Sequence, residues 1–85
     1  MQVITFTNDS QTLEGYEVSW SILPETVRSM GGSVDDRYEA TKFVEIGSFS
    51  GIFLEDDFEY ERFFALSNNT ILSASELEEK GFDWS

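Results

Sequence analysis

Residues 16–22 alternate strictly between apolar and polar side chains, and this alternation constrains the fold more than any other feature of the chain. One face of the segment is apolar and consists of Tyr16, Val18, Trp20 and Ile22; the other consists of Glu17, Ser19 and Ser21. A period of two is typical of a strand with one buried face. The pattern therefore predicts a half-buried strand with Trp20 in the core.

Several other segments are rich in β-branched and aromatic residues, which favour strands. They are residues 3–7, 41–46, 49–54 and 60–66, while residues 70–72 are too few to assign. Gly51 indicates a possible β-bulge in its segment. Residues 35–37 are expected to form an exposed loop.

Two short helices are predicted from their end signals. Pro24 stands near a helix start, and Gly31 and Gly32 follow its end. Residues 73–76 fit a capping box, and Gly81 is a stop signal five residues later. Beyond it, Phe82 and Trp84 are expected to fold back on the body. For Trp84 the core is favoured over a place in an exposed interface.

The 85 residues predict a single domain, residues 1–85, whose core depends on eight Phe, three Tyr and two Trp. The fold class predicted is α+β, as a small single domain with a mainly antiparallel sheet of four to five strands and one or two short helices. A small all-β barrel is the alternative.

The absence of Cys and His restricts the chemistry that the chain can perform. Without them the commonest general base and the usual zinc ligands are missing. The acidic run lacks the spacing of a calcium-binding loop. We therefore expect no catalytic, cofactor or metal site. The first residues show no secretory signal and no segment resembles a membrane span, so a cytoplasmic location is expected.

Acidic residues are numerous and unevenly distributed. The formal net charge is −12, with 17 acidic residues against five Lys and Arg. Residues 35–61 hold nine acids, one Arg and one Lys, or −7 of that total. Such an imbalance costs folding stability through self-repulsion and exceeds the charge of about 2–8 that solubility needs.

The densest part of this region is residues 55–61, with five carboxylates and two aromatic rings. As a strand, it would place Asp57, Glu59 and Glu61 on one face about 7 Å apart, with Phe58, Tyr60 and Phe64 toward the core. Such a ladder would resemble a row of phosphates. The expected partner-binding residues are Asp35, Asp36, Glu39, Glu55, Asp56, Asp57, Glu59, Tyr60 and Glu61. A merely solvated face is the alternative.

The expected function rests on these features and not on a sequence motif. We expect a non-enzymatic inhibitor that mimics nucleic acid and occupies the basic groove of a CRISPR effector, restriction enzyme or other DNA-handling protein, as phage and mobile-element products do. An immunity protein that neutralises a nuclease toxin is one alternative, and an acidic structural or assembly protein is another. Direct contact with nucleic acid is not expected because the charges repel.

Overall fold

Seven strands and three short α-helices make up the structure, a computed structural model that describes residues 2–84. In chain order the elements are β1 (Ile4–Thr7), β2 (Thr12–Val18), the 3₁₀ turn η1 (Trp20–Ile22), α1 (Leu23–Ser29), β3 (Ser33–Tyr38), β4 (Thr41–Ile46), β5 (Phe49–Leu54), α2 (Glu55–Tyr60), β6 (Phe63–Leu66), β7 (Thr70–Ser73) and α3 (Ala74–Glu79).

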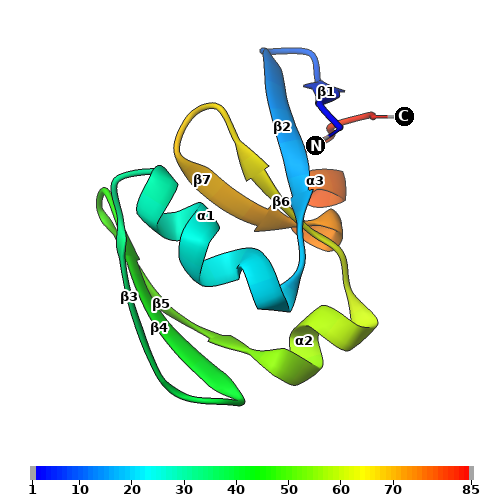
Figure 1. The fold of residues 1–85 in the computed structure, drawn as a ribbon. Coiled ribbons are helices and arrows are strands. Elements are labelled where there is room, and N and C mark those ends of the chain that lie inside the picture. The colour runs from blue at the N-terminus through cyan, green and yellow to red at the C-terminus, as the bar shows by residue number, and fades with distance from the viewer. Residues whose placement is uncertain (1, 85) are drawn as a thin grey trace.

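The strands form two antiparallel sheets (Figure 1). One has the order β1-β2-β6-β7 and the other the order β3-β4-β5. The predicted α+β class with mainly antiparallel pairing is confirmed. The single sheet of four to five strands is instead two sheets, the helices number three, and within residues 2–84 neither sheet closes into a barrel.

The strand predicted at residues 16–22 is correct only as far as Val18, where β2 ends. Trp20 and Ile22 lie in η1, and the side chain of Ile22 is exposed. The chain has to turn here because α1 follows at once and buries Leu23 and Val27 against both sheets. Trp20 still reaches the core, where its ring meets Phe58 edge-on at 5.2 Å.

Strand β6 separates two hydrophobic cores, and all four of its residues are buried. Phe63 and Ala65 point into the first core, which lies between the two sheets and α1. Phe64 and Leu66 point into the second core, on the opposite face of the four-stranded sheet beneath α3. This explains four consecutive apolar residues in one strand, since alternate side chains of a strand face opposite sides.

The C-terminal residues fold back as expected. Phe82 is buried in the second core, and the ring of Trp84 packs 5.5 Å from Phe6 and 5.7 Å from Phe64. Asp83 exchanges two main-chain hydrogen bonds with Thr7, at 3.0 and 2.8 Å. These contacts cover the outer strand β1, so the favoured core placement of Trp84 is correct.

Two expectations for the three-stranded sheet are wrong. Residues 35–37 belong to β3 rather than to a loop, although the register of β3 shifts between Asp35 and Tyr38. Gly51 does not form a bulge, because it pairs with Val44 in an unbroken register. A Cβ at Gly51 would collide with the ring of Phe49, so glycine leaves room for this ring to lie across the strand.

The capping box predicted for α3 is confirmed and gives a stability prediction. The main-chain N–H of Glu76 donates to Ser73 Oγ and the N–H of Ser73 donates to Glu76 Oε1, both at 3.2 Å. We expect Ser73→Ala to lower the free energy of unfolding by about 1 kcal/mol, the usual effect of losing an N-cap side chain. Urea denaturation measures it. A variant as stable as the wild type would show that the cap contributes nothing. Ser67→Ala, at an exposed position between β6 and β7, is the control.

Candidate functional site

The acidic run at residues 55–61 forms helix α2 and not a strand, which corrects the sequence-based expectation. Asp and Glu are poor strand formers, whereas negative side chains in the first turn of a helix interact favourably with its dipole. Glu55, Asp56 and Asp57 occupy that first turn. The predicted ladder of Asp57, Glu59 and Glu61 therefore does not form, because a helix turns successive residues by about 100°.

Helix α2 packs on the core through a single aromatic ring, that of Phe58. Phe58 stacks on Phe63 at 4.2 Å and meets Phe53 and Trp20 edge-on at 5.9 and 5.2 Å. Tyr60 was expected to face the core, but 87% of its side chain is exposed. Because Phe58 alone points inward, the helix directs its carboxylates to solvent.

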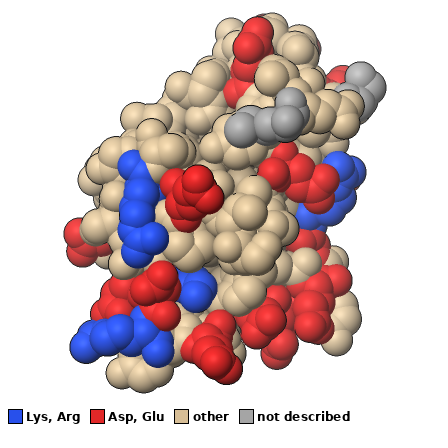
Figure 2. All heavy atoms as spheres, viewed as in Figure 1, with Lys and Arg blue, Asp and Glu red and all other residues tan. Residues whose placement is uncertain are grey.

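The outward side of α2 forms a surface that we call the acidic face, composed of Glu39, Glu55, Asp56 and Glu59. Glu55 and Glu59 are four residues apart, so their side chains are neighbours on one side of the helix. Glu39 belongs to the turn between β3 and β4, which lies beside the start of α2 because Glu55 N–H donates to the carbonyl of Ala40 at 3.0 Å. In residues 2–84 none of the four has a Lys or Arg partner. Figure 2 shows the acidic side chains gathered over α2 at the lower right.

Asp35 and Asp36 were predicted as part of the same patch, but both are neutralised locally. Asp35 accepts two hydrogen bonds from the Arg37 guanidinium, at 3.0 and 2.7 Å, and Asp36 lies 3.6 Å from Arg28. Arg37 holds the pKa of the Asp35 carboxyl below its usual range, first through the side-chain hydrogen bonds. Acidic and basic side chains are accordingly mixed on the left of Figure 2. The carboxylates of α2 therefore have no ion-pair partner in residues 2–84, whereas those of β3 do.

Glu61 links two helices through a hydrogen bond. Its Oε1 accepts a hydrogen bond of 2.9 Å from the main-chain N–H of Ser75, so it joins the end of α2 to the start of α3. Hydrogen bonding from Ser75, through its side chain first and then its main chain, lowers the pKa of Glu61. Glu61 is thus oriented by this hydrogen bond and stays ionised to a lower pH than a free glutamate.

This contact predicts a pH-dependent contribution to stability. Because the pKa of Glu61 in the folded state lies below its usual value of 4.5, its contribution is full above pH 4.5 and disappears as the pH falls through the lower folded value. We expect Glu61→Gln to destabilise the protein at pH 7, and the difference from wild type to shrink as the pH falls below 4.5. Urea denaturation at several pH values tests it. A difference that is constant with pH would contradict the role of the charge.

Sequence reasoning missed the exposed apolar side chains of β5. Phe49, Ile52 and Leu54 are 51%, 60% and 44% exposed. Three consecutive apolar residues, Ile52 to Leu54, were the available signal, since a strand with one solvated face should alternate. In this strand both faces are apolar, and only Phe53 is buried.

Other types of site are not formed by the described part of the chain. In residues 2–84 no three acidic side chains lie close enough together to hold a metal ion. The longest helix there, α1, has seven residues, and none of the helices is suited to crossing a bilayer. The fold and site together define a small acidic α+β domain with an exposed carboxylate-bearing helix. No protein-family model, curated protein or solved structure matches the chain.

Proposed function

We propose that this protein is a non-enzymatic binding module whose acidic face occupies the basic, nucleic-acid-binding groove of another protein. The observation that carries the proposal is the uncompensated charge of α2. Glu55, Asp56 and Glu59 project from a helix fixed by the ring of Phe58, while every Arg in residues 2–84 is paired with an acid elsewhere.

The geometry of the acidic face suits a groove built for phosphates. Side chains one helical turn apart are separated by about 5–6 Å, so a row of Lys and Arg can follow them. Proteins gain much of their affinity for nucleic acid from charge neutralisation, and a carboxylate surface can use the same cationic side chains. Complementary charge also speeds association and makes binding weaker at high salt.

The partner proposed is a CRISPR effector, a restriction enzyme or a nuclease, and the result of binding is inhibition by exclusion of DNA or RNA. The same surface would serve an immunity protein that neutralises one nuclease toxin. The inhibitor and the immunity protein differ in the number of enzymes they inhibit, since an immunity protein acts on a single cognate enzyme. An acidic assembly protein would inhibit none of them.

A competition assay tests the proposal. A fluorescent DNA duplex bound to purified members of each enzyme class is titrated with the protein, and the anisotropy of the duplex is followed at about 50 and 200 mM salt. The expected result is displacement of the duplex from at least one enzyme, more weakly at the higher salt. Displacement that is equal at both salt concentrations would contradict an electrostatic mechanism, and binding to the enzyme without displacement would contradict mimicry.

A further inference from the structure

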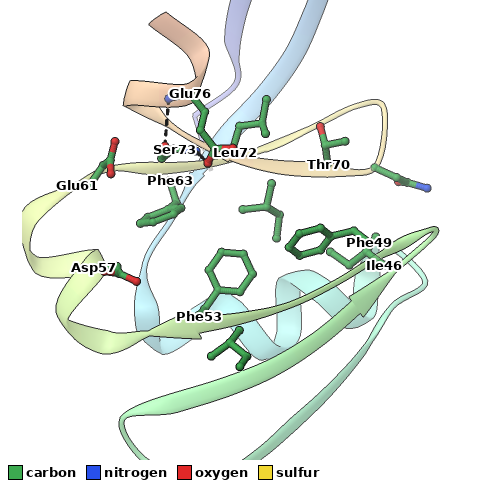
Figure 3. Close-up of a pocket in the computed structure, with 13 residues that line it drawn as sticks. Ile46, Phe49, Phe53, Asp57, Glu61, Phe63, Thr70, Leu72, Ser73 and Glu76 are labelled. Carbon is green, nitrogen blue, oxygen red and sulfur yellow. Dashed lines mark hydrogen bonds between the residues drawn. The ribbon is translucent and has the colours of Figure 1, made fainter. Parts of the chain in front are cut away.

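A groove of about 520 Å³ lies between the two sheets, bordered by β5 on one side and β7 on the other (Figure 3). Each of these strands is the last of its sheet. The side chains in the groove are mostly apolar and include Phe49, Phe53, Phe63 and Ile71. The groove is therefore an open apolar channel between two sheet edges.

The edge of β5 has unused main-chain hydrogen-bonding groups. In an antiparallel pair, hydrogen-bonded and non-hydrogen-bonded residue pairs alternate. Glu55 N–H bonds to Ala40, so counting back along β5 directs the N–H and C=O groups of Ser50, Ile52 and Leu54 away from β4. In residues 2–84 no loop or turn hydrogen bond and no side-chain hydrogen bond involves the main-chain groups of Ser50, Ile52 or Leu54. Three residues of β5 can thus pair with an added strand.

Strand β5 also lacks the features that normally block a sheet edge. Exposed edges usually carry a charge, a proline or a bulge that prevents pairing. The sequence of β5 is Phe-Ser-Gly-Ile-Phe-Leu, without any of these, and its register is regular. By contrast β3, at the other edge of the same sheet, carries Asp35, Asp36 and Arg37 and an irregular register. An unprotected apolar edge of six residues is a site for strand addition.

One end of the groove is acidic, which specifies the charge of its occupant. Asp57, Glu61 and Glu76 line it, and Figure 3 shows Asp57 and Glu61 together at the left end. Hydrogen bonds from Ser75 and Ser73 hold Glu61 and Glu76 in place. None of the three acids is paired with a Lys or Arg of residues 2–84. A second copy of the chain is disfavoured, since each carries −12.

We propose that this groove binds an extended segment of a partner protein, which adds as a strand to the free edge of β5. Alternate side chains of the segment are apolar and pack on Phe53, Phe63 and Ile71. Lys or Arg at one end of the segment meets Asp57, Glu61 and Glu76. This surface is distinct from the acidic face, and the inference holds whether or not the partner binds nucleic acid.

Selection from a phage-displayed library of random peptides about ten residues long, the length of a long strand, tests this proposal. The expected result is enrichment of peptides that alternate apolar residues and carry Lys or Arg near one end. Absence of enrichment, or enriched peptides without a cationic residue, would overturn the proposal.

Two variants at one position separate strand addition from simple apolar contact. Ile52→Pro removes an outward N–H without breaking the β4–β5 ladder, whereas Ile52→Thr shortens the apolar side chain and keeps the N–H. We expect the enriched peptides to bind Ile52→Pro at least about tenfold more weakly than Ile52→Thr, the effect of one lost hydrogen bond together with the obstructing ring. Unchanged melting temperatures confirm that both variants are folded.

Three outcomes would overturn this assignment. The first is equal binding of the peptides to both variants. The second is competition between the peptides and a ligand of the acidic face. Such a ligand is recognised because it loses affinity for the variant that carries both Asp56→Lys and Glu59→Lys. The third is a concentration-dependent dimer that Ile52→Pro abolishes, because it would show that the edge is used by a second copy of the chain.

Discussion

Replacing Phe64 by alanine is expected to lower the free energy of unfolding by about 3–5 kcal/mol, the range for a buried phenylalanine. Phe64 is fully buried and its ring lies 5.2 Å from Phe6 and 5.7 Å from Trp84. The guanidinium of Arg62 sits 5.0 Å from the same ring. A domain of this size has a total stability of about 4–13 kcal/mol, so the loss is a large part of it.

Urea denaturation followed by tryptophan fluorescence measures this loss, since Trp84 contacts the deleted ring. Tyr60→Ala is the matched control, because it deletes an aromatic side chain that is 87% exposed. The control is expected to change stability by less than about 0.5 kcal/mol. A Phe64 variant as stable as the control would mean that the second core does not hold the sheet.

Reversing two charges on the acidic face is expected to weaken binding to a basic partner by about 10–100-fold at low salt. Asp56→Lys with Glu59→Lys changes the formal charge from −12 to −8, two units for each substitution. Both side chains are exposed on α2 and neither has an ion-pair partner in residues 2–84. The fold is expected to remain intact because Phe58, the anchor of the helix, is unchanged.

The matched control is Glu78→Lys with Glu79→Lys, on α3. It makes the same change in net charge at two exposed positions of another helix of six residues. The DNA-displacement assay compares the two variants at low and high salt. If both lose the same affinity, the total charge of the protein is responsible and not the acidic face. If neither loses affinity, the proposed binding surface is wrong.

Local patterns in the sequence predicted much of the fold. Strands at residues 41–46 and 49–54, the helix after Pro24 and the capping box at Ser73 are all present. Each depends on a short-range signal, such as side-chain period, a cap or a turn residue. The division into two sheets could not be predicted in this way. It depends on α1 and β6 burying apolar side chains among segments far apart in the chain.

The candidate site was predicted by composition but not by geometry. Residues 55–61 are acidic whichever element they form, yet the choice of helix over strand rearranges all five carboxylates. Which acids stay unpaired depends on Arg28 and Arg37, whose positions follow from tertiary structure. The groove was missed because its borders, β5 and β7, belong to different sheets.

The position of β6 between the two cores has a consequence for how the molecule comes apart. A strand whose alternate side chains serve opposite cores links their stabilities, because disrupting one core moves the backbone that carries the other. Loss of either core should therefore remove both in one cooperative transition, without a half-folded species. Such a species would leave the apolar edge of β5 without its supporting core and prone to aggregation. Cooperative unfolding therefore protects a domain in which the edge of β5 is unprotected.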